Sequence, residues 1–146
     1  MENQNNKKLY ILFLCTGNSC RSQIAEGWAK ALKPGLIEAF SAGVEPGRVN
    51  QRAIKIMAEV NVDISQHFSK HIDDLGGIEF DYVITLCDHA NEVCPRLPGK
   101  TKHIHHPFSD PSFLLGTEDV ILSEFRKVRE QIKDYIQTLP GSLPEK

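Results

Sequence analysis

The 146-residue sequence has no apolar run that approaches the ~20 residues of a membrane-spanning helix, so we expect no membrane partner. Its formal charge of -2 is far from the basic balance of a general nucleic-acid binder, so we expect no nucleic-acid partner either. The first residues are polar and do not resemble a signal peptide, and four cysteines are too few for a disulfide-dense secreted scaffold. We therefore expect a cytoplasmic protein whose thiols are reduced at rest.

Internal repeats, low-complexity segments and long linkers are also missing, and the length is typical of one domain. We expect a single domain over residues 1–146, with an ordered core over about 8–139, and a monomer. Short apolar runs alternate with helical patterns, which predicts an α/β fold: a four-stranded parallel open sheet flanked by helices on both faces. The expected strands cover residues 9–14, 36–40, 80–86 and 102–105, and the expected helices cover residues 24–32, 51–60 and about 119–138.

The segment Cys-Thr-Gly-Asn-Ser-Cys-Arg-Ser, residues 15–22, lies between the first strand and the first helix. Ligands of open parallel sheets bind at this edge, beyond the carboxyl ends of the strands. Gly17 and Asn18 tolerate a positive φ, so the loop can curl and direct its N–H groups at one point. The following helix adds the positive end of its dipole, which favours an anion. The residues expected to bind an oxyanion are Thr16, Gly17, Asn18, Ser19, Cys20 and Arg21.

Three side chains of this segment predict a nucleophile beneath a bound oxyanion. Arg21 offers a planar fork that can hold two oxygens of a tetrahedral anion. The same positive field stabilises a thiolate at Cys15, to which Ser22 can donate a hydrogen bond. We therefore expect Cys15, Arg21 and Ser22 to be catalytic.

Residues 15–22 resemble the active-site loop of the low-molecular-weight protein tyrosine phosphatase fold. The longer stretch that runs on to Trp28 is similar to one branch of that fold, the thioredoxin-coupled arsenate reductases. The resemblance covers nearly the whole chain in the same order. It continues at Ser41-Ala42-Gly43, Val62-Asp63-Ile64-Ser65, Thr85-Leu86-Cys87, Cys94-Pro95 and Asp110-Pro111.

The resemblance implies arsenate as substrate, arsenite as product and thioredoxin as the external reductant. It assigns the attack on arsenate to Cys15, the attack on Cys15 to Cys87, and the transfer of the disulfide to Cys94, each step after the first being a thiol–disulfide exchange. It also makes Asp110 a general acid. Cys20 has no redox step in this scheme, which indicates a structural role. The short loop between Cys87 and Cys94 has to leave its resting fold to close the Cys87–Cys94 disulfide, and its Asn, Glu and His content is compatible with such mobility.

Other readings of the same residues stay open. A low-molecular-weight tyrosine phosphatase would need only Cys15, Arg21 and Asp110, and a thiol-based redox sensor or arsenic-binding regulator would not need Arg21 or Asp110. Phosphatase activity can persist beside arsenate reduction because the loop does not wholly distinguish tetrahedral oxyanions.

Six histidines raise the possibility of zinc, but the six residues between Cys87 and Cys94 are not the usual short ligand spacing, so we expect no metal. Some relatives hold potassium near the loop with an Asn, a Glu, a Ser and an Asp. Asn18, Glu26 and Ser41 match the first three, whereas the Asp position falls on Lys70. A lysine ammonium there repels a cation or replaces it beside Glu26, so we expect no cofactor and no potassium activation.

Overall fold

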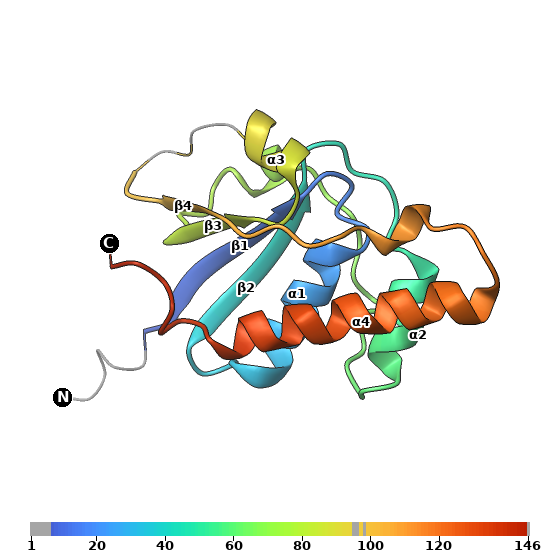
Figure 1. The fold of residues 1–146 in the computed structure, drawn as a ribbon. Helices are drawn as coiled ribbons and strands as arrows, with labels where there is room; N and C mark the ends of the chain where they lie inside the picture. The colour runs from blue at the N-terminus through green and yellow to red at the C-terminus, as the bar shows by residue number, and fades with distance from the viewer. Residues whose placement is uncertain (1–6, 95–96, 98, 146) are drawn as a thin grey trace.

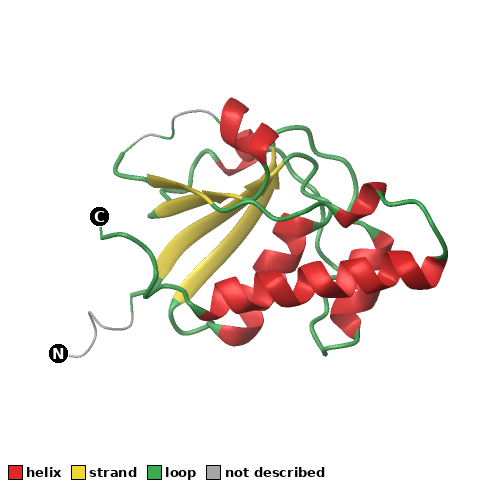
Figure 2. Cartoon of the chain, viewed as in Figure 1, coloured by secondary structure: helices red, strands yellow, loops and turns green. Residues whose placement is uncertain are grey.

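The chain has the fold class that its sequence predicts. The computed structural model describes residues 7–94, 97 and 99–145, so Pro95 and the ends of the expected 1–146 domain lie outside the described residues. Four strands form one sheet in the order β2-β1-β3-β4, and all neighbours are parallel (Figures 1 and 2). The prediction of a four-stranded parallel α/β sheet is therefore confirmed. The strands are β1 (Leu9–Cys15), β2 (Ile37–Gly43), β3 (Tyr82–Thr85) and β4 (Lys102–His105).

Strand β1 lies in the middle of the sheet, as its continuous apolar run predicts. Residues 11–14 are fully buried because β2 and β3 cover both edges of the strand and side chains cover both faces. The register pairs Cys15 with Gly43 and Thr85 with His105, the last residues of their strands. The carboxyl ends of all four strands therefore meet at one edge of the sheet.

Helices pack on the sheet, and in the chain α1 and α3 come after the strands β1 and β3, which end at that edge. Helix α1 packs against β1 and β2, and the long helix α4 packs across α1 (Figure 1). The Trp28 indole N–H of α1 donates to the Arg129 carbonyl of α4 at 3.1 Å, which fixes the two helices together. No helix in the described ranges is long and apolar enough to cross a membrane. The α-helices are α1 (Arg21–Leu32), α2 (Gln51–Ala58), α3 (Asp88–Val93) and α4 (Glu118–Gln137), with 3₁₀ turns η2 (Ile72–Leu75) and η3 (Pro111–Phe113).

The segment between Cys87 and Cys94 is a short helix, α3, so the expectation of a loop there is wrong. Cys87 provides the N-cap, because its sulfur accepts a hydrogen bond from the Ala90 N–H at 3.4 Å. Asp88 in the first turn favours the positive end of the helix. Six residues are too few to display a helical apolar pattern, which is why periodicity does not find this helix.

Candidate active site

The loop of residues 15–22, called here the anion loop, is fixed by the chain that follows β2. Four loop carbonyls, those of residues 15, 16, 17 and 19, accept hydrogen bonds from the N–H groups of residues 44, 45, 47 and 50. The N–H and C=O of a trans peptide point in opposite directions. Because these loop carbonyls face the chain after β2, the loop N–H groups face the opposite side, where a ligand can bind. Asn18 takes the positive φ, 51°, that the curled loop needs, whereas Gly17 does not.

Gly43 at the end of β2 allows the anion loop to lie against the sheet. A Cβ at this position would come within 2.6 Å of the Thr16 carbonyl oxygen and 2.9 Å of the Asn18 nitrogen. Both neighbours are backbone atoms, which cannot move aside as a flexible side chain does. The Ser41-Ala42-Gly43 motif thus has a steric reason for its glycine.

Cys15 lies at the end of β1 in contact with a chain of hydrogen bonds. The Asn18 amide donates to the Ser22 hydroxyl oxygen at 2.8 Å, and that hydroxyl lies 2.9 Å from the Cys15 sulfur. Because the Ser22 oxygen already accepts from Asn18, its own proton is available to the sulfur. All three side chains are buried. This arrangement aims a hydrogen-bond donor at the Cys15 sulfur.

Asn18 and Ser22 act from beneath the anion loop and do not line its cavity. Asn18 is fully buried, and its side-chain oxygen accepts from the Lys70 backbone N–H at 3.0 Å. The Asn18 carbonyl accepts from the Ser69 hydroxyl at 2.7 Å. The side chain of Asn18 therefore holds the loop in shape, so any contact of this residue with an oxyanion is through its backbone.

Arg21 begins α1 and reaches across the site to the loop after β4. Its guanidinium donates to the Phe108 carbonyl at 2.9 Å and to the Asp110 carboxylate at 3.1 Å. Asp110 also accepts from the backbone N–H and the hydroxyl of Ser112, at 2.9 and 2.6 Å. These contacts hold the Arg21 and Asp110 side chains against each other, and both are largely shielded from solvent.

A cavity of about 340 Å³ brings most of the predicted site together. The Cys15 and Cys87 thiols line it with Arg21 and Asp110, and the Thr16 hydroxyl lies 3.1 Å from the Cys87 sulfur. The remaining lining residues are Gly17, Ser19, Cys20, His89, Ser112 and Phe113. Cys94 lies elsewhere, at the far end of α3, where it lines a separate hollow with Thr101, Lys102 and His103.

The four cysteines are all thiols, and their surroundings differ. Cys15, Cys20 and Cys87 are buried, whereas Cys94 is half-buried. Burial raises the pKa of the Cys20 thiol far above its usual range, and the nearby Asp110 carboxylate adds to the rise. Burial also raises the pKa of the Cys94 thiol. Cys20 is thus held as a neutral thiol, which agrees with the structural role expected for it.

The chain is similar to known proteins over most of its length. The family model described as low molecular weight phosphotyrosine protein phosphatase matches residues 10–146. This chain belongs to that family. An arsenate reductase of Halalkalibacterium halodurans is 45% identical over 133 residues, which are 91% of this chain and 95% of that protein.

Two solved structures extend the comparison within the phosphatase family. An arsenate reductase in a phosphate-binding state is 35% identical, with a TM-score of 0.71, and the match covers 93% of this chain and 99% of that one. A thioredoxin-dependent arsenate reductase of Corynebacterium glutamicum is 27% identical, with a TM-score of 0.64, over 89% of this chain and 62% of that one. These relatives favour the arsenate-reductase reading over the phosphatase reading.

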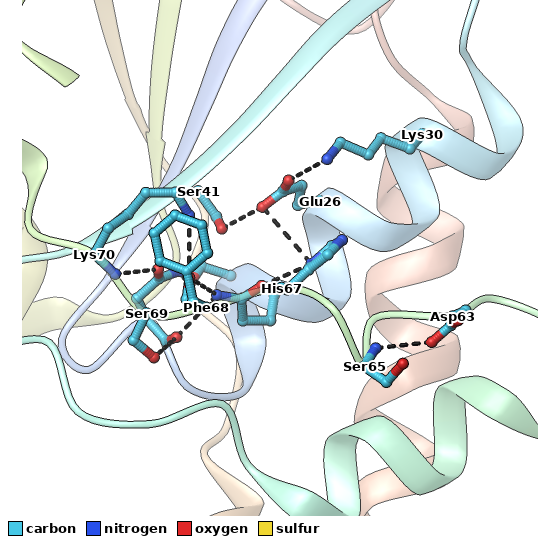
Figure 3. Close-up of polar contacts among 12 residues, drawn as sticks. Glu26, Lys30, Ser41, Asp63, Ser65, His67, Phe68, Ser69 and Lys70 are labelled. Atoms are coloured by element: carbon cyan, nitrogen blue, oxygen red, sulfur yellow. Dashed lines mark hydrogen bonds and ion pairs between the residues drawn. The ribbon is translucent and has the colours of Figure 1, made fainter. Parts of the chain in front are cut away.

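Two lysines, Lys30 and Lys70, lie near the buried Glu26 carboxylate (Figure 3). Glu26 is buried, accepts from the Ser41 hydroxyl and forms an ion pair with Lys30. The Lys70 ammonium lies nearby, donating to the Phe68 carbonyl at 3.2 Å. Burial lowers the pKa of Lys70 and the Glu26 carboxylate opposes that change. The Glu26 carboxylate therefore already has the Lys30 ammonium as its counter-charge and lies close enough to Lys70 to influence it.

The histidines are distributed among several elements. His67 contacts the Gln23 side chain at 2.8 Å behind the anion loop, and burial lowers its pKa. His106 stacks on Tyr135, with a ring distance of 3.9 Å. Among the described residues, no group of three potential ligands is placed to hold a metal ion.

Sequence reasoning missed the contacts that surround α3. His105 bonds to both Thr85 and Asp88, and His89 bonds to Glu45. The alternation of His103 and His105 along a strand was the available signal, since it puts both side chains on one face. This signal does not predict the contact with Asp88, because a loop between Cys87 and Cys94 gives Asp88 no fixed position.

Proposed function

We propose that this chain reduces arsenate to arsenite for arsenic detoxification, with Cys15, Cys87 and Cys94 acting in turn. The observation that supports this most is the single cavity holding the Cys15 and Cys87 thiols beside Arg21, with Cys94 one short helix away. A phosphatase needs only the first of these thiols. Two relatives named arsenate reductase, 45% and 48% identical to this chain, support the same proposal.

The first half of the proposed reaction takes place in the cavity. Arsenate enters the anion loop, where the N–H groups and Arg21 hold its oxygens. The Cys15 thiolate attacks arsenic(V), and an arsenic–oxygen bond breaks as water leaves with a proton supplied by Asp110. The Cys87 thiolate then attacks the Cys15 sulfur. The sulfur–arsenic electron pair stays on arsenic, which leaves as arsenite, and a Cys15–Cys87 disulfide remains.

The second half returns the enzyme to its thiol form. The Cys94 thiolate attacks the Cys87 sulfur, so the disulfide moves to Cys87–Cys94 and Cys15 leaves as a thiolate. Thioredoxin then reduces Cys87–Cys94 by two further exchanges. The thioredoxin dependence of the Corynebacterium glutamicum relative supports this choice of reductant. We further propose that the protein acts as a monomer in the cytoplasm.

A coupled assay tests the whole proposal. Arsenate is added to the protein with thioredoxin, thioredoxin reductase and NADPH, and NADPH oxidation is followed together with arsenite release. We expect arsenate-dependent oxidation with one arsenite per NADPH. Oxidation that is independent of arsenate would favour a redox sensor, and an inactive protein that binds arsenite would favour a regulator.

Phosphatase activity is the second candidate function, because Cys15, Arg21 and Asp110 share the cavity. Aryl phosphate hydrolysis needs no second thiol. The Cys87→Ser variant separates the two functions: it should retain whatever aryl phosphate hydrolysis the wild type has and lose arsenite production.

Asp110→Asn should lower arsenite turnover by about 10²-fold with little change in KM, because the amide cannot supply the proton that leaves with oxygen. The single asparagine oxygen can still accept from the Ser112 N–H and hydroxyl, and Arg21 then keeps its hydrogen bond to the Phe108 carbonyl. Steady-state kinetics at saturating thioredoxin measure both constants. Ser112→Ala, which removes a hydrogen bond to Asp110 but no proton donor, is the control. Unchanged turnover in Asp110→Asn would exclude the acid role.

Potassium chloride should give the same turnover as sodium chloride at constant ionic strength. The reason is that the Lys30 and Lys70 ammonium groups already compensate the Glu26 carboxylate. Initial rates in the coupled assay measure this, with choline chloride as the reference salt. Stimulation of several-fold by potassium alone would contradict the prediction.

A further inference from the structure

Helix α3 separates the two thiols that the proposed relay must join. A helix rises about 1.5 Å per residue, so seven steps from Cys87 to Cys94 span about 10 Å. A disulfide requires Cα atoms within about 7 Å of each other. If the relay proposed above is correct, α3 must therefore unwind during every cycle. Whatever stabilises α3 controls the second half of the reaction.

The first turn of α3 is held to the sheet by His105. One ring nitrogen of His105, Nε2, lies 2.8 Å from the Asp88 carboxylate, and the other, Nδ1, lies 2.8 Å from the Thr85 hydroxyl. The carboxylate can only accept, so Nε2 carries the proton and donates. Thr85 and His105 are partners in the β3–β4 register, so the sheet fixes this end of the contact. We call these residues the Thr85–His105–Asp88 bridge.

The N-cap of α3 is itself a reacting group. The Cys87 sulfur accepts from the Ala90 N–H at 3.4 Å in the resting thiol form. When Cys87 attacks Cys15, its sulfur is drawn to a new partner and a lone pair is used in the new bond, so the cap is weakened. Three side-chain contacts then hold the first turn of α3. They are the Thr85–His105–Asp88 bridge, whose Asp88 carboxylate is exposed, the Thr85 hydroxyl 3.3 Å from the Asn91 side-chain oxygen, and the exposed His89–Glu45 pair on the other side.

We propose that His105 is a positioning residue of the thiol relay. Through Asp88 it holds α3 in its helical form, and so keeps Cys94 away from Cys87 until Cys87 has formed its bond with Cys15. The exchange that follows is the attack of the Cys94 thiolate on the Cys87 sulfur. The Cys87–Cys94 bond forms, the Cys15–Cys87 bond breaks, Cys15 leaves as a thiolate, and the Cys94 proton goes to solvent.

Two substitutions of His105 separate its two hydrogen bonds. The side-chain nitrogen of Gln occupies the place of Nε2, so His105→Gln retains a donor to Asp88. The side chain of Asn reaches only the place of Nδ1, so His105→Asn retains the contact with Thr85 and loses Asp88. His105→Phe keeps a ring and loses both bonds.

The test is the equilibrium between the Cys87–Cys94 dithiol and disulfide, measured in dithiothreitol redox buffers by thiol alkylation and mass spectrometry. A Cys15→Ala background prevents the competing disulfide. Because the bridge stabilises only the helical dithiol form, His105→Asn and His105→Phe should shift the equilibrium toward the disulfide by roughly 3- to 10-fold. His105→Gln should stay near the parent value. Equal constants for all three variants and the parent would overturn the proposal.

A matched control and a second readout separate positioning from general destabilisation. Glu118→Gln breaks the exposed Arg52–Glu118 ion pair between α2 and α4, far along the chain from α3, and should leave the equilibrium unchanged. Amide hydrogen exchange should rise at residues 88–93 in His105→Asn and stay unchanged in Glu118→Gln. An equal shift in the control would also overturn the proposal. The equilibrium needs no arsenate, so failure of the wild type to release arsenite would refute the proposed function and leave this result intact.

Discussion

Cys15→Ser should release no measurable arsenite, in a single turnover or in many. A serine hydroxyl at the end of β1 would be far less nucleophilic than the thiolate, and the sulfur that must later join Cys87 would be absent. We expect a loss of at least about 10³-fold in arsenite production, measured by the coupled assay and by direct arsenite detection. Serine is close to cysteine in size, so the anion loop keeps its fold and arsenate or phosphate should still bind.

Cys20→Ser is the matched control for this prediction, because it makes the same exchange in the same loop. The Cys20 thiol is buried, and burial raises its pKa far above the usual range, so it stays protonated. We expect turnover within about twofold of the wild type, because Cys20 has no redox step in the proposed relay. A loss in Cys20→Ser equal to that in Cys15→Ser would mean that the anion loop uses a different thiol from the one we assign.

The sheet was predictable because its signals are local. The apolar run of β1 and the stripe of α4 each extend over enough residues to show their period, and Asn50 caps α2 as its residue type indicates. The anion loop was predictable for a related reason, since its catalytic residues lie within one short segment between a strand and a helix.

The contacts between distant segments were not predictable in this way. The pairing of Arg21 with Asp110 spans 89 positions and depends on how the chain returns after β4. Helix α3 was missed because its cap is a sulfur and its length is less than two turns. The expected role of Asn18 in binding an oxyanion also needed the structure, which places its side chain beneath the anion loop and in contact with Ser22.

Cys94→Ser should release one arsenite per chain and then stop. The cavity holds everything that the first half of the proposed reaction needs, and Cys94 lies outside it, so the burst should have the wild-type amplitude. The Cys15–Cys87 disulfide formed at that point lies where both sulfurs are buried in the resting form, so we expect thioredoxin to reach it poorly. Steady-state turnover in the coupled assay should fall by at least about 10²-fold, the scale expected when a step in the reaction loses its nucleophile.

Comparison with Cys87→Ser decides whether the order of the thiols is correct. That variant keeps Cys15 and the anion loop but lacks the Cys87 thiol that takes the Cys15 sulfur from arsenic. Cys20, the other thiol in the cavity, stays protonated because burial raises its pKa, so the variant should give no burst. Rapid quench with arsenite detection measures the burst, and peptide mapping identifies the disulfide, expected between Cys15 and Cys87 in Cys94→Ser. A burst in Cys87→Ser with none in Cys94→Ser would reverse the assigned order. Cys94 would then take the Cys15 sulfur from arsenic, and α3 would have to unwind before the first electron transfer and not after it.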